Sequence, residues 1–321
     1  MQPPSPPASP TESAELQRVA WRAVLGAAAR ARRAEPEPRA FGLDAAGALM
    51  SLPGDNERAW LQWRPGAGWA ALPRAPAPAR AVLDLYLPLA SASVRAPLTL
   101  AHLGQSLDGC IATGSGDSYY VTGPDNVRHL HRLRALCDAV VVGAGTIARD
   151  DPQLTVRHVE GKNPVRVIVD PRRGLGPHHR VFSDGQAETL LVCAADAARD
   201  ARHGSAEVIA VREADGRLDL AALLDALHAR GLSSVFVEGG GRTVSHFLEA
   251  GLLDRLQIAI APLVTGNGRP GLTLPAKNKI AECLRPMHRV FTMGGDVLFD
   301  CDLRTGGAPQ RDATGTLERV L

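Results

Sequence analysis

Polar and charged side chains gather in one stretch of this 321-residue chain, between Gly104 and Arg157. A turn that contains Ser106 and Asp108 is followed by a glycine- and serine-rich loop, a segment with several arginines, and the run Asp150-Asp151-Pro152. Taken singly, such features are ordinary turn and surface chemistry in an α/β protein. Their density at successive strand ends predicts a ligand site, because open α/β sheets bind ligands outside the carboxyl ends of their strands.

A glycine cluster follows a second buried strand, at Gly239-Gly240-Gly241, and Arg242 and Thr243 come directly after it. Glycines let a pyrophosphate approach the backbone, and a helix N-terminus favours an anion. The cluster is not a Walker loop, and it does not fit the Gly-x-Gly-x-x-Gly pattern of ordinary dinucleotide-binding domains. On its own it is as compatible with a tight turn as with a phosphate site.

Short apolar runs that alternate with helical patterns predict the scaffold for these clusters: a largely parallel sheet, with helices on both faces and a closing antiparallel hairpin. One helix opens at Pro124, which suits a first helical turn, and we expect its buried stripe to be Val127, Leu130, Leu133 and Cys137. Further helices are predicted over 218–230 and 243–250. The predicted strands are Leu98–Leu103, Ala139–Val142, Val165–Asp170, Leu190–Ala194, Val208–Val211, Val235–Val237, Ile258–Ile260, Val290–Met293 and Val297–Cys301.

The first 95 residues have a different character, and we expect a small α+β extension of unknown role. Residues 1–10 are rich in proline and serine and are predicted to be disordered, whereas Glu15–Arg33 is helix-prone. Short alternating segments at 40–50 and 60–72 predict a small sheet that carries three of the four tryptophans. The main domain then covers residues 96–304, and residues 305–321 form a polar tail.

Two segments connect the extension to the main domain. Pro73–Ala79 is a linker by composition. Ala81–Leu89 is apolar and is interpreted as a strand that leads into the main domain.

Composition limits the classes of function. A net charge of +2, with basic residues spread along the chain, disfavours nucleic acid as a partner. No apolar run is long enough to span a membrane, and the N-terminus lacks the pattern of a secretory signal. The five cysteines form no Cys-x-x-Cys motif, so we predict a cytoplasmic protein without a disulfide framework. The histidines show no credible metal set, and we expect no metal.

Nine motifs, in the same order along the chain, resemble one known family. This family is the C-terminal reductase domain of the bifunctional riboflavin-biosynthesis deaminase/reductase, which has a dihydrofolate-reductase-like fold. The resemblance covers roughly residues 97–303, and no single motif carries it. The motifs are SLDG (106–109), SGDS (115–118), VTGP (121–124), HRLRA (131–135), VGAGT (142–146), DDPQLTVR (150–157), NPVRVIVD (163–170), VFVEGGG (235–241) and APLVTG (261–266).

The resemblance implies a three-layer αβα sheet, an NADPH cofactor and a homodimer. We expect the deaminase half of the bifunctional enzyme to be absent, because the first 95 residues contain neither His-x-Glu nor Pro-Cys-x-x-Cys. The positions that match cofactor contacts are Gly104, Tyr120, Thr146, Asp150, Gly239, Gly240, Gly241, Arg242 and Thr243. At Tyr120 the family usually has tryptophan.

The same resemblance implies a substrate that carries a ribose phosphate and a uracil ring. The matched substrate positions are Ser118, Arg134, Leu154, Arg157 and Glu238. Arginines suit a phosphate, and hydroxyl or carboxylate groups suit a sugar. Structural alternatives stay open for two of them: Arg134 could pair with Asp138, and Glu238 could cap the following helix.

His102 departs from the family, which commonly has lysine at this position, and Cys110 likewise replaces a basic residue. A histidine can polarise or protonate a sugar near neutral pH, and His102 is therefore the candidate catalytic residue. A lone histidine on a strand is also an ordinary structural residue. For the 2′-phosphate of NADPH we consider Arg172 and Arg173, which follow the strand at 165–170.

The predicted function is NADPH-dependent reduction of the ribosyl group of 5-amino-6-(5-phosphoribosylamino)uracil to the ribitylamino product. Two alternatives remain. One is a reductase of the related 2,5-diaminopyrimidine or another pterin-like heterocycle. The other is a non-catalytic nucleotide-binding module with a partner-docking N-terminal segment.

Overall fold

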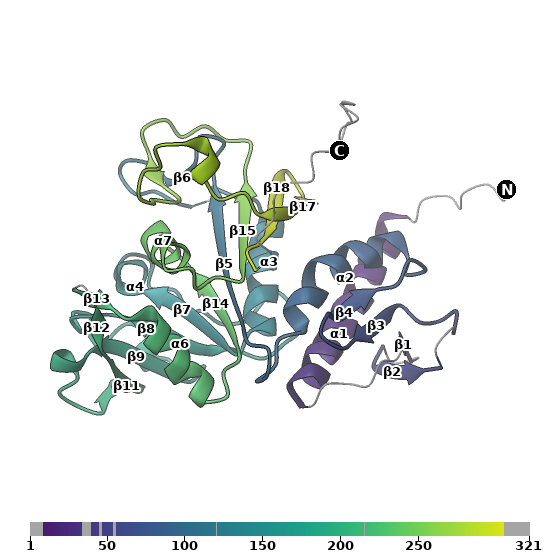
Figure 1. Cartoon of the computed structure of the whole chain (residues 1–321), viewed down its shortest axis with the longest axis horizontal. Helices are drawn as coiled ribbons and strands as arrows, with labels where there is room; N and C mark the ends of the chain where they lie inside the picture. The colour runs from purple at the N-terminus through teal and green to yellow at the C-terminus, as the bar shows by residue number, and fades with distance from the viewer. Residues whose placement is uncertain are drawn as a thin grey trace. The chain divides into compact units, whose positions relative to one another are not determined.

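The computed structural model describes residues 9–33, 40–44, 47–53, 56–119, 121–214 and 216–304. The chain divides into two compact units, residues 1–97 and 98–321, and each is described by itself (Figure 1). Residues 1–8 and the predicted tail from 305 onward lie outside the described residues, whereas Pro10 already begins a helix.

The first unit is a small antiparallel sheet with two helices, of which the sheet and the first helix agree with the prediction. Its elements are α1 (Pro10–Arg33), β1 (Ala40–Leu43), β2 (Leu49–Leu52), β3 (Leu61–Arg64), β4 (Gly68–Ala71) and α2 (Ala77–Ala90), with strand order β2-β1-β3-β4. Trp21 of α1 packs edge-on against Tyr86 of α2, with ring centroids 5.4 Å apart. Phe41 and Trp63 both pack against Trp69, so the tryptophans form the core of this unit.

The strand predicted at Ala81–Leu89 is wrong, because these residues belong to helix α2. The helix also includes the last three residues of the predicted linker. Its apolar run is continuous, which makes a buried helix and a buried strand hard to tell apart by periodicity. Packing against α1 and β4 buries most of this run and stabilises the helix.

The second unit is built on a ten-stranded sheet with the order β10-β11-β9-β8-β7-β14-β5-β15-β18-β17. The seven strands from β11 to β15 are parallel, and β18 and β17 close the sheet as an antiparallel hairpin, which confirms the predicted architecture. The strands are β5 (Leu98–Gln105), β7 (Ala139–Gly143), β8 (Val165–Val169), β9 (Thr189–Ala194), β10 (Arg202–His203), β11 (Ala206–Val211), β14 (Ser234–Glu238), β15 (Arg255–Ile260), β17 (Met287–Met293) and β18 (Asp296–Asp302).

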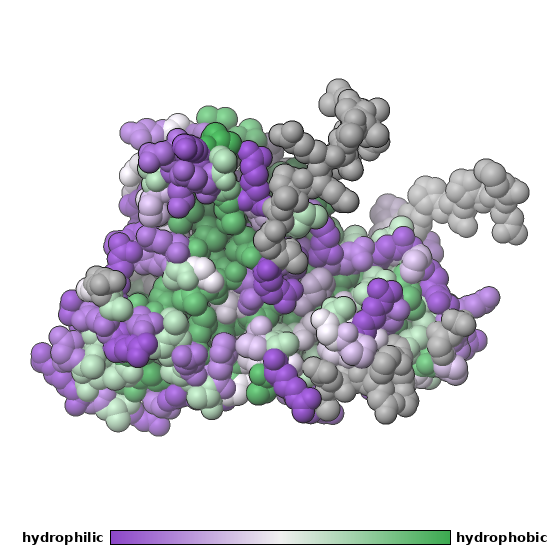
Figure 2. All heavy atoms as spheres, in the orientation of Figure 1, coloured by the Kyte–Doolittle hydropathy of each residue, from purple (hydrophilic) through white to green (hydrophobic). Residues whose placement is uncertain are grey.

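Helices cover both faces of this sheet. Apolar residues of α6 (Leu220–Ala229) and α7 (Gly241–Glu249) pack on one face, in a cluster that includes Leu103, Val141 and Val237. The opposite face, which carries the alternate residues of each strand, is covered by α3 (Pro124–Leu136). In the space-filling view, hydrophobic residues lie in the middle of this unit and hydrophilic residues along its outer edge (Figure 2). The remaining elements are β6 (Cys110–Ala112), α4 (Ala144–Asp150), α5 (Arg180–Ser183), β12 (Glu213–Ala214), β13 (Arg217–Leu218) and β16 (Arg269–Pro270).

The buried side of α3 is more polar than predicted. Val127 is 41% exposed, whereas Asn126, His129 and Arg134 are buried. Leu133 and Cys137 of the predicted stripe are buried as expected. Polar residues occupy this interface because the sheet beneath presents polar partners for them.

These partners form one row across five neighbouring strands, which we call the polar row. It consists of Glu238 on β14, His102 on β5, Gln257 on β15, Asp300 on β18 and Arg289 on β17, each in register with the next. Residues in register on neighbouring strands share a face, so all five side chains lie on the α3 side of the sheet.

Asp300 is fully buried, and its carboxylate accepts the hydrogen bonds at one end of the polar row. Arg255 donates to it from Nη2 at 2.6 Å and from Nε at 3.1 Å, Arg289 donates at 2.7 Å, and Gln257 Nε2 donates at 3.1 Å. Burial by itself would raise the pKa of Asp300, but the two arginines outweigh it and hold the pKa below its ordinary value. The carboxylate therefore stays ionised in the core.

We expect Asp300→Ala to lower the free energy of unfolding by about 3–5 kcal/mol, because it leaves buried Arg255 without its main counter-charge. Since the folded pKa of Asp300 is depressed, its contribution is complete above the unfolded pKa near 4 and is lost as pH falls below it. Urea unfolding at pH 7 and at pH 3–4 measures both effects.

The control is Asp196→Ala, which removes an exposed carboxylate 3.7 Å from Arg172 and should change stability by less than about 1 kcal/mol. Equal stability losses for the two variants would contradict a structural role for the Asp300 pair.

Candidate functional site

A cavity of about 900 Å³ lies at the carboxyl ends of the central parallel strands. Its walls include residues of β5, β7, β8 and β14 on one side, and of β6 and β16 on the other. This volume is at the upper end of the range usual for small-molecule sites. The position agrees with the expectation that a ligand site lies beyond the strand ends.

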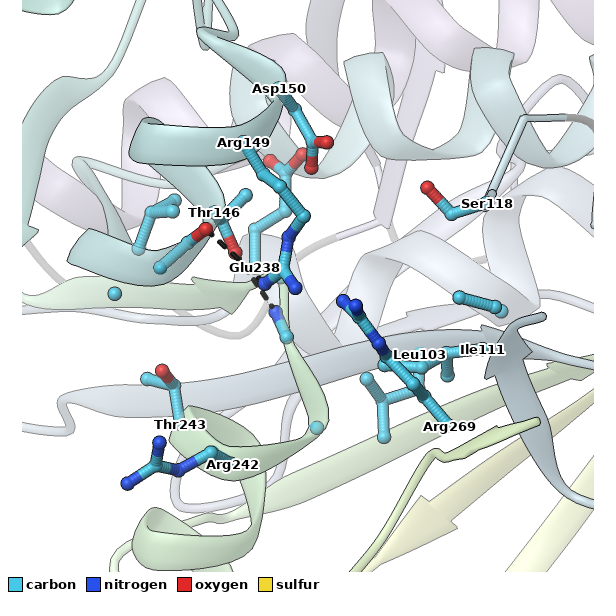
Figure 3. A pocket seen from close by; sticks show the side chains of 18 of the residues that line it. Leu103, Ile111, Ser118, Thr146, Arg149, Asp150, Glu238, Arg242, Thr243 and Arg269 are labelled. Atoms are coloured by element: carbon cyan, nitrogen blue, oxygen red, sulfur yellow. Dashed lines mark hydrogen bonds between the residues drawn. The ribbon is translucent and has the colours of Figure 1, made fainter. Parts of the chain in front are cut away.

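Most of the predicted site residues meet in this cavity (Figure 3). Arg134, Arg157, Arg172 and Arg173 are not part of its lining, and Tyr120 lies outside the described residues. The predicted residues that line it are His102, Gly104, Ser118, Thr146, Asp150, Leu154, Glu238, Gly239, Gly240, Gly241, Arg242 and Thr243.

The glycine cluster turns the chain from β14 into α7. Gly239 has φ +114°, a conformation that favours glycine, and Gly240 is the N-cap of α7 without a side-chain cap. A Cβ on Gly241 would lie 2.0 Å from the carbonyl oxygen of Gly271, so this position requires glycine for close packing. The N-terminal amides of α7 therefore border the cavity without side-chain capping, an arrangement that suits a phosphate group.

Glu238 is held at the cavity by Arg134. Arg134 Nε donates to Glu238 Oε2 at 2.8 Å, its Nη2 donates to the other carboxylate oxygen, and its Nη1 donates to the carbonyl of Thr155 at 3.0 Å. Burial acts to lower the pKa of Arg134, but Glu238 outweighs it and the pKa lies above its ordinary value. Arg134 thus holds the Glu238 carboxylate in place at the cavity.

Neither structural alternative for this pair is observed. Asp138 instead accepts hydrogen bonds from the backbone amides and hydroxyls of Ser233 and Ser234. No side chain caps α7.

Three of the predicted arginines are engaged elsewhere. Arg157 is exposed and donates to the Thr155 hydroxyl at 2.6 Å. Arg172 lies 3.7 Å from Asp196 and 3.5 Å from Glu213 and is 67% exposed. Arg173 donates to the carbonyl of Arg202 at 2.6 Å. Arg172 and Arg173 follow the strand at 165–170 in the sequence, but their side chains take partners outside the cavity lining.

His102 and Asn126 present unpaired polar atoms to the cavity. They are 3% and 2% exposed, and within the described residues both ring nitrogens of His102 and Oδ1 of Asn126 lack a hydrogen-bond partner. Such buried groups are costly unless something satisfies them. Gly104 belongs to this arrangement, because a Cβ there would lie 2.8 Å from Thr122 and 3.2 Å from the Asn126 amide.

His102 is a neutral imidazole at physiological pH. Burial is the main cause that lowers its pKa well below the ordinary value, and the neighbouring His129 adds to it. The His129 ring lies edge-on to His102, with ring centroids 5.0 Å apart, and Gln257 Oε1 accepts a 2.9 Å hydrogen bond from His129 Nε2. Burial therefore favours the neutral imidazole form of His102, which can donate and accept hydrogen bonds.

Sequence reasoning missed several polar residues of the cavity, among them Asn126, Arg149 and Arg269. Arg149 precedes Asp150 and had the same local signal. Arg269 is distant in sequence and reaches the cavity only because β16 pairs with β6. Within the described ranges, no three His, Cys, Asp or Glu side chains are grouped in a way that could hold a metal. No helix among the described residues is long and apolar enough to cross a bilayer.

Comparison with known proteins agrees with this geometry. Residues 97–292 match the family model described as the RibD C-terminal domain. The chain is 35% identical to the 2,5-diamino-6-ribosylamino-4(3H)-pyrimidinone 5′-phosphate reductase of Methanothermobacter thermautotrophicus, over 64% of this chain and 97% of that protein. It is 32% identical to the riboflavin biosynthesis protein RibD of Escherichia coli, over 58% of this chain and 54% of that protein.

A solved structure gives the same result. The deaminase/5-amino-6-(5-phosphoribosylamino)uracil reductase of Thermotoga maritima is similar with a TM-score of 0.54 and 26% identity, over 70% of this chain and 61% of that one. The chain therefore belongs to the RibD C-terminal domain family of riboflavin-biosynthesis reductases. The predicted family and fold class are confirmed, and the family implies a nicotinamide cofactor.

The buried histidines are expected to make the free energy of unfolding depend on pH. Burial is the main cause that lowers the pKa of His129, to about 3. An unfolded histidine titrates near 6.5, so between these values the unfolded state binds more protons. We therefore expect the contribution of His129 to the free energy of unfolding to be fully present above pH 6.5. It should decrease as pH falls from 6.5 towards 3.

Urea unfolding at pH 7, 6 and 5 measures this dependence. His129→Gln, which retains a hydrogen-bonding side chain next to Gln257, should have a shallower slope than the wild type. An unchanged slope would show that His129 does not titrate as the structure requires.

Proposed function

We propose that this chain reduces the ribosylamino group of a phosphorylated ribosylaminopyrimidine to the ribitylamino group, with NADPH as the cofactor. The observation that carries the proposal is the buried imidazole of His102, next to Asn126 Oδ1, in a cavity bordered by the N-terminus of α7, which has no side-chain cap. These features suit a ligand with phosphate and hydrogen-bonding groups, and the chain belongs to a reductase family.

The residues present fit a dinucleotide. The turn at Gly239–Gly241 and the α7 amides would receive the pyrophosphate, with Thr146, Arg242 and Thr243 around them. Gly104 and Asp150 are the other proposed contacts. When bound, the cofactor supplies the hydride, and the protein supplies orientation and electrostatics.

The proposed substrate contacts lie near the polar row. Glu238, with its carboxylate fixed by Arg134, would accept hydrogen bonds from the sugar hydroxyls, while Ser118 and Leu154 line the same cavity. His102 would hydrogen-bond the ribosyl group as a neutral imidazole, since it stands beside Glu238 on the next strand. Arg134 acts through Glu238, and Arg157 stays a prediction without a place in the lining.

Two pyrimidines are candidates, 5-amino-6-(5-phosphoribosylamino)uracil and its 2,5-diamino counterpart. Both appear in the names of matched proteins. They differ in having an oxo or an amino group at one ring position, so the site must accept a carbonyl or an amine there. The homodimer and the cytoplasmic location implied above remain predictions.

The direct test follows the loss of nicotinamide absorbance with both pyrimidines and both reduced cofactors. We expect turnover with one pyrimidine and NADPH, and more than a tenfold loss of kcat/KM in Glu238→Gln, which keeps shape but removes charge. Thermal unfolding must show that the variant is folded. Cofactor binding without turnover on either pyrimidine would favour a non-catalytic nucleotide-binding module.

Cofactor choice requires a cation for the 2′-phosphate. Arg172 and Arg173 were the predicted residues, but their engagement with Asp196, Glu213 and the Arg202 carbonyl makes Arg242 the better candidate. Arg242 lies beside Thr243 at the start of α7 (Figure 3).

We expect Arg242→Ala to weaken NADPH binding selectively, by roughly ten- to a hundredfold, the equivalent of about 1.5–3 kcal/mol. Arg172→Ala and Arg173→Ala serve as comparison variants. Titration of each with NADPH and NADH decides among the three. Equal effects on both cofactors in all variants would leave the 2′-phosphate site unassigned to any of them.

A further inference from the structure

We propose that Asn126 is a positioning residue whose Oδ1 accepts a hydrogen bond from one ring nitrogen of His102 and thereby leaves the other ring nitrogen as an acceptor for the substrate. The pairing of the two side chains stands independently of the reaction, whereas the acceptor role rests on the proposed function. Asn126 lies in α3 between the motifs VTGP and HRLRA and belongs to neither. The substrate group that suits an acceptor nitrogen is a sugar hydroxyl.

Both side chains are buried at the wall of the cavity. His102 lies on β5 and is 3% exposed, and Asn126 lies in the first turn of α3 and is 2% exposed. Among the described residues that line the cavity, these two alone have buried side-chain atoms without a well-formed hydrogen bond: both ring nitrogens of His102, and Oδ1 of Asn126. A donor and an acceptor are therefore buried in the same wall, and pairing removes the cost that each carries alone.

The Asn126 amide is oriented by the turn before it. Its Nδ2 donates to Thr122 Oγ1 at 2.8 Å, so the unpaired end of the amide is Oδ1. Gly104, two residues beyond His102 on the same face of β5, makes room for this arrangement. A Cβ at Gly104 would lie 2.8 Å from Thr122 Cγ2 and 3.2 Å from Asn126 Nδ2. A side chain at Gly104 would therefore push Asn126 away from the strand that carries His102.

The start of α3 is also tied to the sheet by its backbone. Gly123, the N-cap of α3, donates its amide to Asp296 Oδ2 at 2.7 Å. Asp296 begins β18 and is 3% exposed. This buried hydrogen bond fixes the turn directly before Asn126, so both backbone and side-chain contacts preorganise the amide.

The other polar neighbours of His102 already have partners. Gln257 and Glu238 are in register with His102 on the two adjoining strands. Gln257 accepts from His129 Nε2 at 2.9 Å and donates to a buried carboxylate at 3.1 Å. Glu238 accepts two hydrogen bonds from one guanidinium group. Within the described residues, Asn126 Oδ1 is the acceptor near His102 that remains open.

The chemistry of the two groups determines their roles. An amide oxygen only accepts hydrogen bonds, and a neutral imidazole carries one N–H and one acceptor nitrogen. When His102 donates its N–H to Asn126, the nitrogen left for a ligand must be the acceptor. The pKa of His102 agrees with this direction, because burial and then His129 lower it, whereas a hydrogen bond with the Asn126 side chain acts to raise it. A hydrogen bond raises the pKa of a histidine when the ring is the donor.

Nuclear magnetic resonance of the full chain, with nitrogen-15 in the histidine rings, measures the tautomer directly, because protonated and unprotonated ring nitrogens differ in chemical shift. His102→Gln identifies the resonances of His102. We expect one tautomer of His102 to dominate in the wild type at neutral pH, by roughly tenfold or more. Asn126→Leu, which has a similar branched shape and no acceptor, should bring the two tautomers closer to equal population.

Asn56→Leu is the matched control. Asn56 lies in the first unit, outside the cavity lining, and its Oδ1 accepts a 2.9 Å hydrogen bond from a backbone amide. The variant therefore loses an asparagine hydrogen bond of the same kind. It should leave the resonances of His102 and the turnover unchanged.

Asn126→Asp keeps the acceptor oxygen and adds a negative charge. The charge should raise the pKa of His102 by about one to three pH units, which the same resonances measure. The other titratable groups near His102, His129 and Glu238, are the same in the variant and the wild type. Protonation removes the acceptor nitrogen, so turnover of Asn126→Asp should be low below the new pKa and should recover above it. Asn126→Leu should lower kcat/KM by roughly tenfold or more at every pH.

Three results would overturn the proposal. They are an even mixture of His102 tautomers in the wild type, an unchanged tautomer population in Asn126→Leu, and turnover of Asn126→Asp above the wild-type level at neutral pH, which would make His102 a proton donor to the substrate. Thermal unfolding shows whether each variant is folded, and Asn126→Ala replaces a variant that is not. The proposed function fails separately: the wild type would turn over neither pyrimidine, while the tautomer of His102 still depended on Asn126, and the acceptor role alone would fall with it.

Discussion

The polar row constrains the whole of the second unit, because ionised and polar side chains cross its sheet under α3. Such groups cost several kcal/mol to bury unless each has a partner. Asp300 meets this requirement at one end through Arg255, Arg289 and Gln257. Glu238 meets it at the other end through Arg134. The register of five strands and the placement of α3 are thereby tied to specific pairs.

His102 is the member of the polar row whose polar atoms have no protein partner in the described residues. It lies between Glu238 and Gln257, with His129 against its ring. The neighbouring members of the row are hydrogen-bonded to protein partners, and the unpaired nitrogens of His102 lie at the cavity. A ligand in the cavity could therefore supply hydrogen bonds to His102.

Much of the scaffold could be predicted because its signals are local. Apolar runs such as Ala139–Val142 identify buried strands, and Gly239-Gly240-Gly241 after a strand identifies a turn that needs glycine. The position of Glu238 at a strand end placed it in the cavity. Helix α2 was misread because a continuous apolar run has no distinctive period.

The long-range partners could not be predicted in this way. The 104-residue separation of Arg134 and Glu238 is invisible to a helix-period argument, which proposed Asp138 instead. Arg269 reaches the cavity through a two-residue strand with no recognisable pattern. Arg172 and Arg173 follow the expected strand, but they pair with nearby carboxylates, and Arg173 also donates to a backbone carbonyl. Side-chain direction and competing partners decide these cases, and both arise from tertiary structure.

The central claim is that the cavity at the strand ends binds a nicotinamide cofactor against the glycine turn and a phosphorylated sugar beside the polar row. A crystal structure of the full chain with NADP⁺ and ribose 5-phosphate tests it most directly. The account predicts the pyrophosphate at the Gly239–Gly241 amides, and the sugar within hydrogen-bonding distance of Glu238 and of His102 or Asn126. Ligands bound elsewhere, with His102 and Asn126 still unpaired, would contradict it.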